Sequence, residues 1–319
     1  KCAVWGSVGS GKTGGMLHAI KHLLDTFDVA HVLIVGPKRV VAEVWPDEIA
    51  DWGLKLSYTH LTDSADKRMK ILQEPLPEIT FITQDLVEWL RSCFKRKPPP
   101  WDMIVIDESS GFGDASTDRF RGLNPFCLFA RRVVELTGTP ASNGLMKLWS
   151  QMFLLDHGVA LGTTITNYRS TYFEKNIYTN RYVPRRGLDK AIHRRVTPMV
   201  LRIDASDFMT LPPTLSGTKK IHLPPPLMLK YQQFEEEFLF KLENGGVLAA
   251  ANAAVTSGKC RQLCNGAIYD DQHVAHHVHD LKLDALEELL TSLDGEPLLL
   301  YYQFISDAER IKTRFPFAK

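Results

Sequence analysis

Short, almost uninterrupted apolar runs recur through the first part of the chain, and amphipathic segments separate them. Runs of this kind predict parallel strands that are buried on both faces, because helices cover both sides of a parallel sheet. The intervening segments have helical spacing, which favours a doubly wound α/β domain. The predicted strands are CAVWG (2–6), HVLIVG (31–36), EITFIT (78–83), DMIVID (102–107) and RVVELTG (132–138), and the predicted helices cover 14–25, 40–52 and 62–73.

A glycine-rich loop follows the first predicted strand and leads into the first predicted helix. It reads GSVGSGKT and fits the pattern G-x-x-x-x-G-K-[ST]. Glycines let such a loop curl so that its backbone N–H groups point at a phosphate, and the following helix adds its positive end. The lysine contacts the β- and γ-phosphates, and the last hydroxyl binds Mg²⁺. The candidate ATP-binding residues are therefore Gly6, Gly9, Ser10, Gly11, Lys12 and Thr13.

Two adjacent acids, Asp107 and Glu108, end the fourth predicted strand. Like charges side by side destabilise each other unless a cation lies close, and open parallel sheets bind ligands at the carboxyl ends of their strands. We expect Asp107 to face the Mg²⁺ that Thr13 holds, and Glu108 to orient or deprotonate the attacking water. Lys12, Asp107 and Glu108 are the candidate catalytic residues. The alternative is an ordinary strand end with solvated acids.

The rest of the chain predicts two further parts. Residues 146–205 contain a helix and then a basic, aromatic stretch without strand periodicity, which indicates a helical elaboration. Residues 206–319 predict an incomplete second α/β unit, so that residues 1–145 form the first lobe. Its expected strands cover 218–223 and 297–304, and its expected helices cover 227–243, 250–266, 280–293 and 306–315.

Composition limits the function classes only weakly. The net charge of +1 gives no sign of a basic nucleic-acid-binding protein, so any such binding depends on local patches. No apolar stretch reaches the roughly 18 residues of a membrane helix, so no membrane partner is expected. Five cysteines without a C-x-x-C pair fit a reducing, cytoplasmic setting. The histidine-rich segment 273–279 alternates like an exposed strand or hairpin, which is favoured over a metal site.

The order of the motifs resembles that of superfamily 2 helicases and translocases, and in detail that of the Swi/Snf-type branch. The phosphate loop, DESS (107–110) and ELTGTPASNGLMKLWSQMFLLD (135–156) match its first three main motifs. The stretch 211–238 resembles the linker into the second lobe, KCRQLCNG (259–266) resembles a stretch of that lobe, and 282–311 leads to the fourth motif. DESS resembles the phage and prophage members in particular, which implies a bacterial or phage-infected cell.

The resemblance implies a P-loop NTPase with two RecA-like lobes, parallel sheets and ATP with Mg²⁺ as cofactors. It implies an ATP-dependent motor on nucleic acid, preferably double-stranded DNA, that translocates without processive unwinding. It also implies that the motifs at 36–41 and 82–84 contact the phosphate backbone. The motif at 137–139, at the end of the fifth predicted strand, would couple nucleotide state to DNA contact, and the fourth motif would lie on the second lobe. The matching residues are Pro37, Lys38, Thr83, Thr137, Gly138, Thr139 and Gln303.

Two departures from the family pattern raise further expectations. Nothing precedes the phosphate loop where the family contacts adenine, and the fifth and sixth motifs with their arginine fingers would follow Lys319. Because such a finger contributes on the order of 10³–10⁵ in rate, we expect the 319-residue chain alone to hydrolyse ATP slowly, with negligible stimulation by DNA. Two alternatives stay open: a non-catalytic DNA- or protein-binding module that kept the fold, and the motor of a restriction or defence assembly with a nuclease partner.

Overall fold

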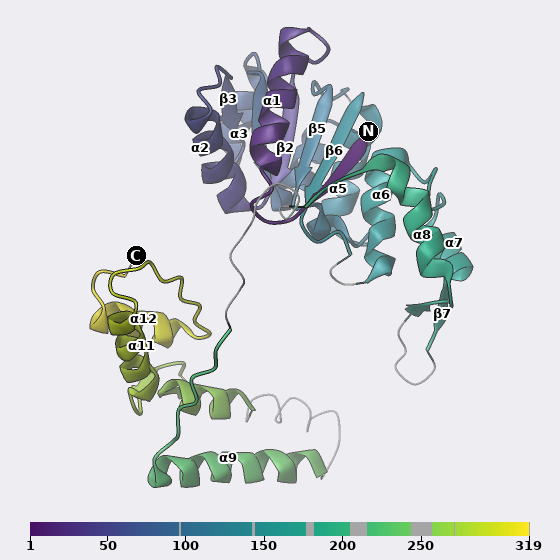
Figure 1. The fold of residues 1–319 in the computed structure, drawn as a ribbon. Helices are drawn as coiled ribbons and strands as arrows, with labels where there is room; N and C mark the ends of the chain where they lie inside the picture. The colour runs from purple at the N-terminus through teal and green to yellow at the C-terminus, as the bar shows by residue number, and fades with distance from the viewer. Residues whose placement is uncertain are drawn as a thin grey trace. The chain divides into compact units, whose positions relative to one another are not determined.

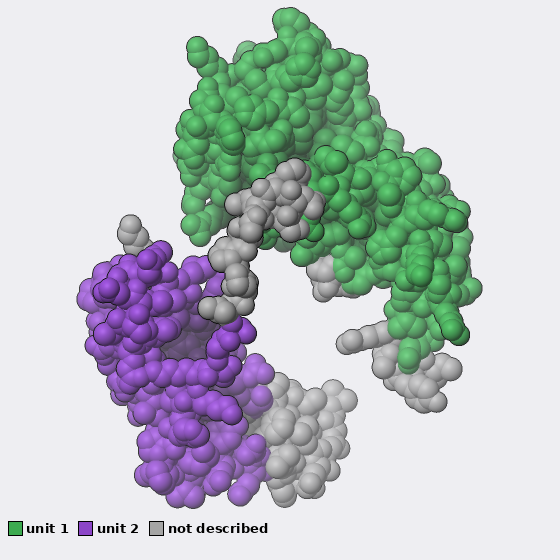
Figure 2. Space-filling view, in the orientation of Figure 1, with its two compact units in different colours: residues 1–212 green, residues 213–319 purple. Residues whose placement is uncertain are grey.

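The computed structural model divides the chain into two compact units, residues 1–212 and 213–319 (Figure 2). It describes residues 1–95, 97–141, 144–176, 182–204, 216–243, 257–270 and 272–318. No helix in this part of the chain is long and apolar enough to cross a membrane.

A seven-stranded, all-parallel sheet forms the centre of the first unit (Figure 1). All five predicted strands are confirmed. Two edge strands, β3 and β9, escaped the prediction because they are short and partly exposed, so that their sequences lack a continuous apolar run. The order is β3 (Tyr58–His60), β4 (Ile79–Thr83), β2 (Val32–Gly36), β5 (Met103–Asp107), β6 (Arg132–Thr137), β1 (Cys2–Gly6) and β9 (Val200–Ile203).

Alternate residues of the strands belong to two separate cores. Val32 and Ile34 pack with helices α1 and α2 on one face of the sheet. Leu33 and Val35 belong to the core with α4, α5 and α6 on the other face. The three predicted helices are confirmed. The bounds are α1 (Lys12–Asp25), a π-helical turn at Val40–Val44, α2 (Trp45–Asp51), α3 (Ala65–Gln73), α4 (Val87–Cys93) and α5 (Asp118–Phe129), with 3₁₀ turns at Gln84–Leu86 and Ser109–Phe112.

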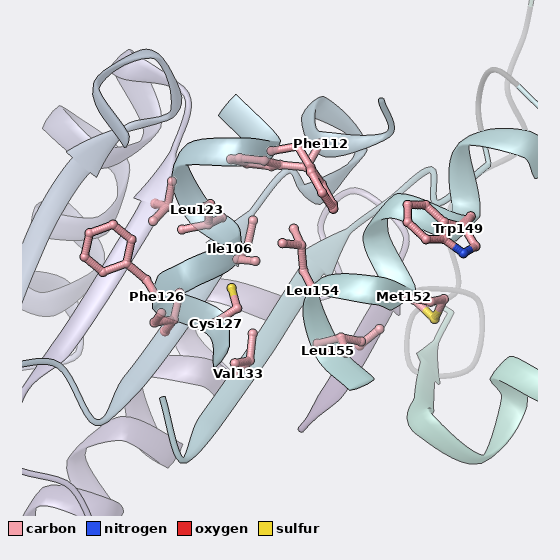
Figure 3. Packing of buried hydrophobic residues seen from close by; sticks show 14 of the residues in the cluster. Ile106, Phe112, Leu123, Phe126, Cys127, Val133, Trp149, Met152, Leu154 and Leu155 are labelled. Carbon is pink, nitrogen blue, oxygen red and sulfur yellow. The ribbon is translucent and has the colours of Figure 1, made fainter. Parts of the chain in front are cut away.

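Residues 145–204 extend the core of the first unit. Trp149, Met152 and Leu155 of α6 belong to the same buried cluster as the sheet residues Ile106 and Val133 (Figure 3). The stretch contains the helices of the expected elaboration, and it also contains strands that its sequence pattern did not indicate: β9 returns to pair with β1, and a short hairpin precedes it. The elements are a 3₁₀ turn at Leu145–Lys147, α6 (Leu148–Asp156), α7 (Ile165–Tyr172), β7 (Phe173–Lys175), β8 (Tyr182–Pro184), α8 (Leu188–Val196) and a 3₁₀ turn at Thr197–Met199.

The described residues of the second unit form helices and one hairpin. The hairpin expected around 273–279 is confirmed, as β10 (Ala267–Tyr269) pairs antiparallel with β11 (Ala275–His277). The predicted helices are confirmed as α9 (Pro225–Glu243), a helix over 257–265, α11 (Leu281–Ser292) and α12 (Ile305–Arg314); residues 250–256 of the prediction lie outside the described residues.

The two strands predicted for this unit are wrong. Segments 218–223 and 297–304 form no ladder, and Leu299 and Tyr301 are 76% and 85% exposed. A central parallel strand needs a hydrogen-bonded neighbour on each side, and within the described part of the unit no segment supplies one. The apolar run is therefore left on the surface.

Candidate nucleotide-binding site

One edge of the sheet collects the ends of five strands. The register pairs Trp5 with Thr137, and Asp107 with Leu136 one strand further along. Beyond them, Gly36 at the end of β2 pairs with Thr83 of β4. The loops that follow these strands therefore begin side by side. Every predicted site residue lies at this edge except Gln303, which belongs to the second unit.

The phosphate loop has the backbone that its glycines predict. Gly9 and Gly11 have φ of 76° and 71°, and Gly11 is the N-cap residue of α1. A Cβ atom on Gly6 would lie 2.5 Å from Ser10 Oγ and 2.9 Å from Lys12 Cγ, so a side chain here would displace both residues of the loop. The Ser10 hydroxyl is buried and has no hydrogen-bond partner among the described residues. A curled loop with an unpaired hydroxyl at a helix N-terminus fits a bound phosphate.

Lys12 folds back across this loop. Its Nζ donates hydrogen bonds to the carbonyl oxygens of Gly6 at 2.8 Å and of Ser7 at 2.9 Å. Burial raises the pKa of both Asp107 and Glu108, and the charge of the same ammonium opposes that rise. Lys12 therefore lies within electrostatic reach of the loop and the acids together.

Asp107 is buried, and both of its carboxylate oxygens have partners. Oδ2 accepts a hydrogen bond from Trp45 Nε1 at 2.9 Å, and Oδ1 accepts one from the backbone N–H of Glu108 at 2.9 Å. Burial raises the pKa of Asp107, and these two hydrogen bonds and the charge of Lys12 oppose that rise. The side chain is thus held in one orientation at the end of β5.

Glu108 takes a backbone conformation that is uncommon for a residue other than glycine, with φ 50° and ψ 54°. Desolvation and the charge of Asp107 raise the pKa of its exposed side chain. Gln84 fixes the turn, because its Nε2 donates to the carbonyl oxygens of Asp107 at 3.1 Å and of Glu108 at 3.3 Å. Backbone strain of this kind clusters at functional sites.

The loop after β6 is tied to the same neighbourhood. Thr137 Oγ1 accepts a hydrogen bond from the N–H of Thr139 at 3.1 Å. A Cβ atom on Gly138 would lie 3.3 Å from the carbonyl oxygen of Gly6, which shows how closely this loop approaches the phosphate loop. Gln151 joins it to the acid-bearing turn, because it accepts from Ser109 Oγ at 3.3 Å and donates to the carbonyl of Pro140 at 2.7 Å.

The donor set fits Mg²⁺ bound together with a nucleotide. Thr13 offers a hydroxyl and Asp107 a carboxylate, both at the same edge of the sheet. Mg²⁺ prefers oxygen ligands and in nucleotide sites takes one or two carboxylates with phosphate oxygens and water. These residues are the ones that the sequence predicted for the ion.

Sequence reasoning missed the residues that support the site. Trp45, Gln84 and Gln151 hold Asp107, the turn of Glu108 and the loop after β6. One signal was available for Trp45, because a buried indole N–H needs an acceptor. The partners of the two glutamines depend on tertiary packing, which the sequence pattern does not contain.

A curled glycine loop, a lysine and a strand-end acid on an all-parallel sheet define a P-loop NTPase. Comparison with known families narrows the class: residues 6–269 match the SNF2-related domain. The chain belongs to this family, which implies the use of ATP.

Several relatives support this placement. Protein p41 of Acyrthosiphon pisum secondary endosymbiont phage 1 is 29% identical over 99% of this chain and 71% of its own length. DNA excision repair protein ERCC-6-like of Mus musculus is 28% identical over 50% of this chain, which corresponds to 13% of that protein. The Sulfolobus solfataricus SWI2/SNF2 ATPase core in complex with dsDNA has a TM-score of 0.56 at 19% identity, covering 98% of this chain and 64% of that one. The last likeness shows the fold.

Proposed function

We propose that this chain is part of an ATP-dependent motor that translocates on double-stranded DNA. The observation that carries the proposal is the meeting of Lys12, Asp107 and the loop after Thr137 at one edge of the sheet. A site that only binds nucleotide needs no close contact with a further loop. Here Gly138 approaches the phosphate loop closely enough for a change at the phosphates to reach the 137–140 loop.

Each residue of the site has a proposed task. The backbone N–H groups of Gly6–Thr13 cradle the phosphates, and Lys12 exchanges its carbonyl partners for phosphate oxygens. Thr13 and Asp107 hold Mg²⁺, which would stabilise the charge that develops on the phosphates. Glu108 orients the attacking water or accepts its proton, and its raised pKa brings it nearer to the range of a general base.

The nucleic-acid surface is proposed on the same edge. Lys38 is exposed directly after β2, and Pro37 and Thr83 lie at the neighbouring strand ends. An ammonium, a hydroxyl and backbone N–H groups are suitable partners for DNA phosphates. We assign residues 1–145 to the ATP-binding lobe and 206–319, with Gln303, to part of the second lobe. The dsDNA bound to the Sulfolobus solfataricus relative supports the choice of nucleic acid.

Replacement of Lys12 by alanine tests the proposal. We expect Lys12→Ala to weaken ATP binding about 10- to 100-fold, because charge-assisted hydrogen bonds contribute roughly 1.5–3 kcal/mol each. ATP hydrolysis by the whole protein should disappear with it. Lys21→Ala is the matched control, since Lys21 lies on the same helix and pairs with Asp25. DNA-dependent hydrolysis that survives Lys12→Ala would contradict the motor.

A further inference from the structure

The structure holds an indole–carboxylate contact behind the candidate Mg²⁺ site. We propose that Trp45 is a positioning residue for Asp107: its N–H fixes the carboxylate so that the protein presents a preformed ligand to Mg²⁺. The inference rests on the proposed function, because it concerns the same site. Trp45 Nε1 lies 2.9 Å from Asp107 Oδ2, and the bond joins two residues 62 positions apart.

The backbone before Trp45 is built to aim it. Val40–Val44 form a π-helical turn, and the N–H of Trp45 donates to the carbonyl oxygen of Val40, five residues earlier. A π-turn inserts one residue into a helix and so turns the following side chains to a different side of it; such turns occur often at functional sites. The turn begins two residues after Lys38, close to the edge that carries the site. This position allows the indole of Trp45 to donate its hydrogen bond to Asp107 at the end of β5.

Packing prevents the indole from moving. Trp45 is 0% exposed and lies in the core with Val41 and Ile49, with its ring centroid 6.4 Å from that of Phe81. A phenylalanine ring would supply apolar contact at this position without a polar atom. The indole N–H adds a buried donor that costs free energy unless it finds an acceptor. Its acceptor is the carboxylate that the site requires.

The bond completes the restraint on Asp107. Asp107 Oδ1 accepts a hydrogen bond from the N–H of Glu108. This donor belongs to the next residue, so donor and acceptor move together when the turn moves. Trp45 thus supplies the restraint that comes from another element. Such partners of a metal ligand typically change metal affinity 10- to 100-fold when they are lost.

The test compares nucleotide binding with and without Mg²⁺. Trp45→Phe removes the N–H and keeps an aromatic ring, and Trp52→Phe is the matched control, because Trp52 Nε1 donates to Glu48 Oε2 at 2.8 Å and not to Asp107. Calorimetric titration of the whole protein with ADP is run in MgCl₂ and in EDTA. We expect Trp45→Phe to bind ADP in EDTA with an affinity within about twofold of that of the wild type. The factor by which Mg²⁺ increases the affinity for ADP should fall about tenfold or more in this variant. Trp52→Phe should match the wild type in both.

A second variant separates positioning from folding. Site-specific replacement of Trp45 by 3-benzothienylalanine keeps the shape of the ring system and lacks the N–H, so it should fold and show the same selective loss. A wild-type gain from Mg²⁺ in either Trp45 variant would overturn the inference, as would an equal loss of affinity in MgCl₂ and EDTA. Failure of the wild type to bind ADP under both conditions would instead contradict the proposed function.

Discussion

Glu135 is a fully buried carboxylic acid on β6, 0% exposed, and the proposed reaction does not use it. Burial raises its pKa well above the ordinary value, and the nearby Ser109 hydroxyl opposes the shift. The folded chain therefore keeps a proton that the unfolded chain loses above pH ~4.3. Because the native state binds more protons, the free energy of unfolding falls as pH rises through the interval between the two pKa values.

Glu135→Gln removes this penalty. The variant should resist thermal unfolding better than the wild type at pH ~8 and lose the advantage near pH ~4. Within the interval the difference grows by about 1.4 kcal/mol per pH unit. Melting curves at several pH values measure it, and a difference that does not depend on pH would show that Glu135 has the same pKa in the folded and the unfolded chain, which contradicts the raised pKa.

The pKa values of the two acids of the site, Asp107 and Glu108, are shifted in the same direction. Desolvation raises the pKa of Asp107 and of Glu108. Mg²⁺ binds the ionised carboxylate, so the gain in nucleotide affinity from Mg²⁺ should decline on acidification at a pH above the ordinary carboxyl range of about 4. Titrations between about pH 8 and about pH 5 test this. A gain from Mg²⁺ that stays constant down to about pH 5 would contradict the raised pKa of Asp107.

The sequence predicted the candidate phosphate and Mg²⁺ ligands, but not the residues that support them. Lys12, Thr13 and Asp107 stay predictions, and they could be made because phosphate and Mg²⁺ binding demand those side chains at those positions after a strand. Glu135 was counted as part of an apolar strand, since β6 is buried along most of its length and one acid hardly changes the pattern. The role of Trp45 depends on a contact across 62 residues, which periodicity does not encode.

Between elements, one glycine sets how closely two helices approach. A Cβ atom on Gly122 of α5 would lie 2.7 Å from the backbone N of Glu88 and 2.8 Å from its Cα, in α4. Backbone atoms cannot move aside as a flexible side chain can. Gly122→Ala should therefore destabilise the fold by roughly 1–3 kcal/mol or more, although alanine favours helix by about 1 kcal/mol.

Chemical denaturation measures this effect, and Gly15→Ala provides the control. Gly15 lies in α1, and a Cβ atom added to it would have open space within 4 Å. Alanine there should leave the free energy of unfolding unchanged or raise it by up to about 1 kcal/mol. If Gly122→Ala and Gly15→Ala changed the free energy of unfolding equally, helix propensity and not the contact between α4 and α5 would explain the effect of Gly122→Ala.

Strands were predictable from the sequence where both faces of the sheet are buried. The five central strands of the first unit read as apolar runs because helices cover both faces of the sheet. The same kind of run at 297–304 forms no strand, since strand formation also needs partners that the run itself does not specify. Apolarity thus predicts the tendency to be a central strand, and neighbouring segments decide the outcome.

In the molecule as a whole, the first unit contains the complete sheet and all the predicted nucleotide ligands. We expect residues 1–212 to fold alone and to bind ADP with an affinity within about tenfold of that of the longer chain, because both hydrophobic cores lie essentially within this unit. Circular dichroism and calorimetric titration of this fragment test the claim. A fragment that folds but does not bind ADP would place an essential ligand outside it.

Movement on double-stranded DNA is the activity proposed for the motor of which this chain is a part. ATP hydrolysis by that full-length motor, and not by the 319-residue chain alone, tests the proposal. It is measured without DNA, with single-stranded DNA and with double-stranded DNA. We expect slow basal hydrolysis that double-stranded DNA stimulates more than single-stranded DNA does, and loss of that stimulated hydrolysis in Lys12→Ala. Hydrolysis that neither DNA changes, while ADP still binds, would contradict the motor and leave a nucleotide-binding module in its place.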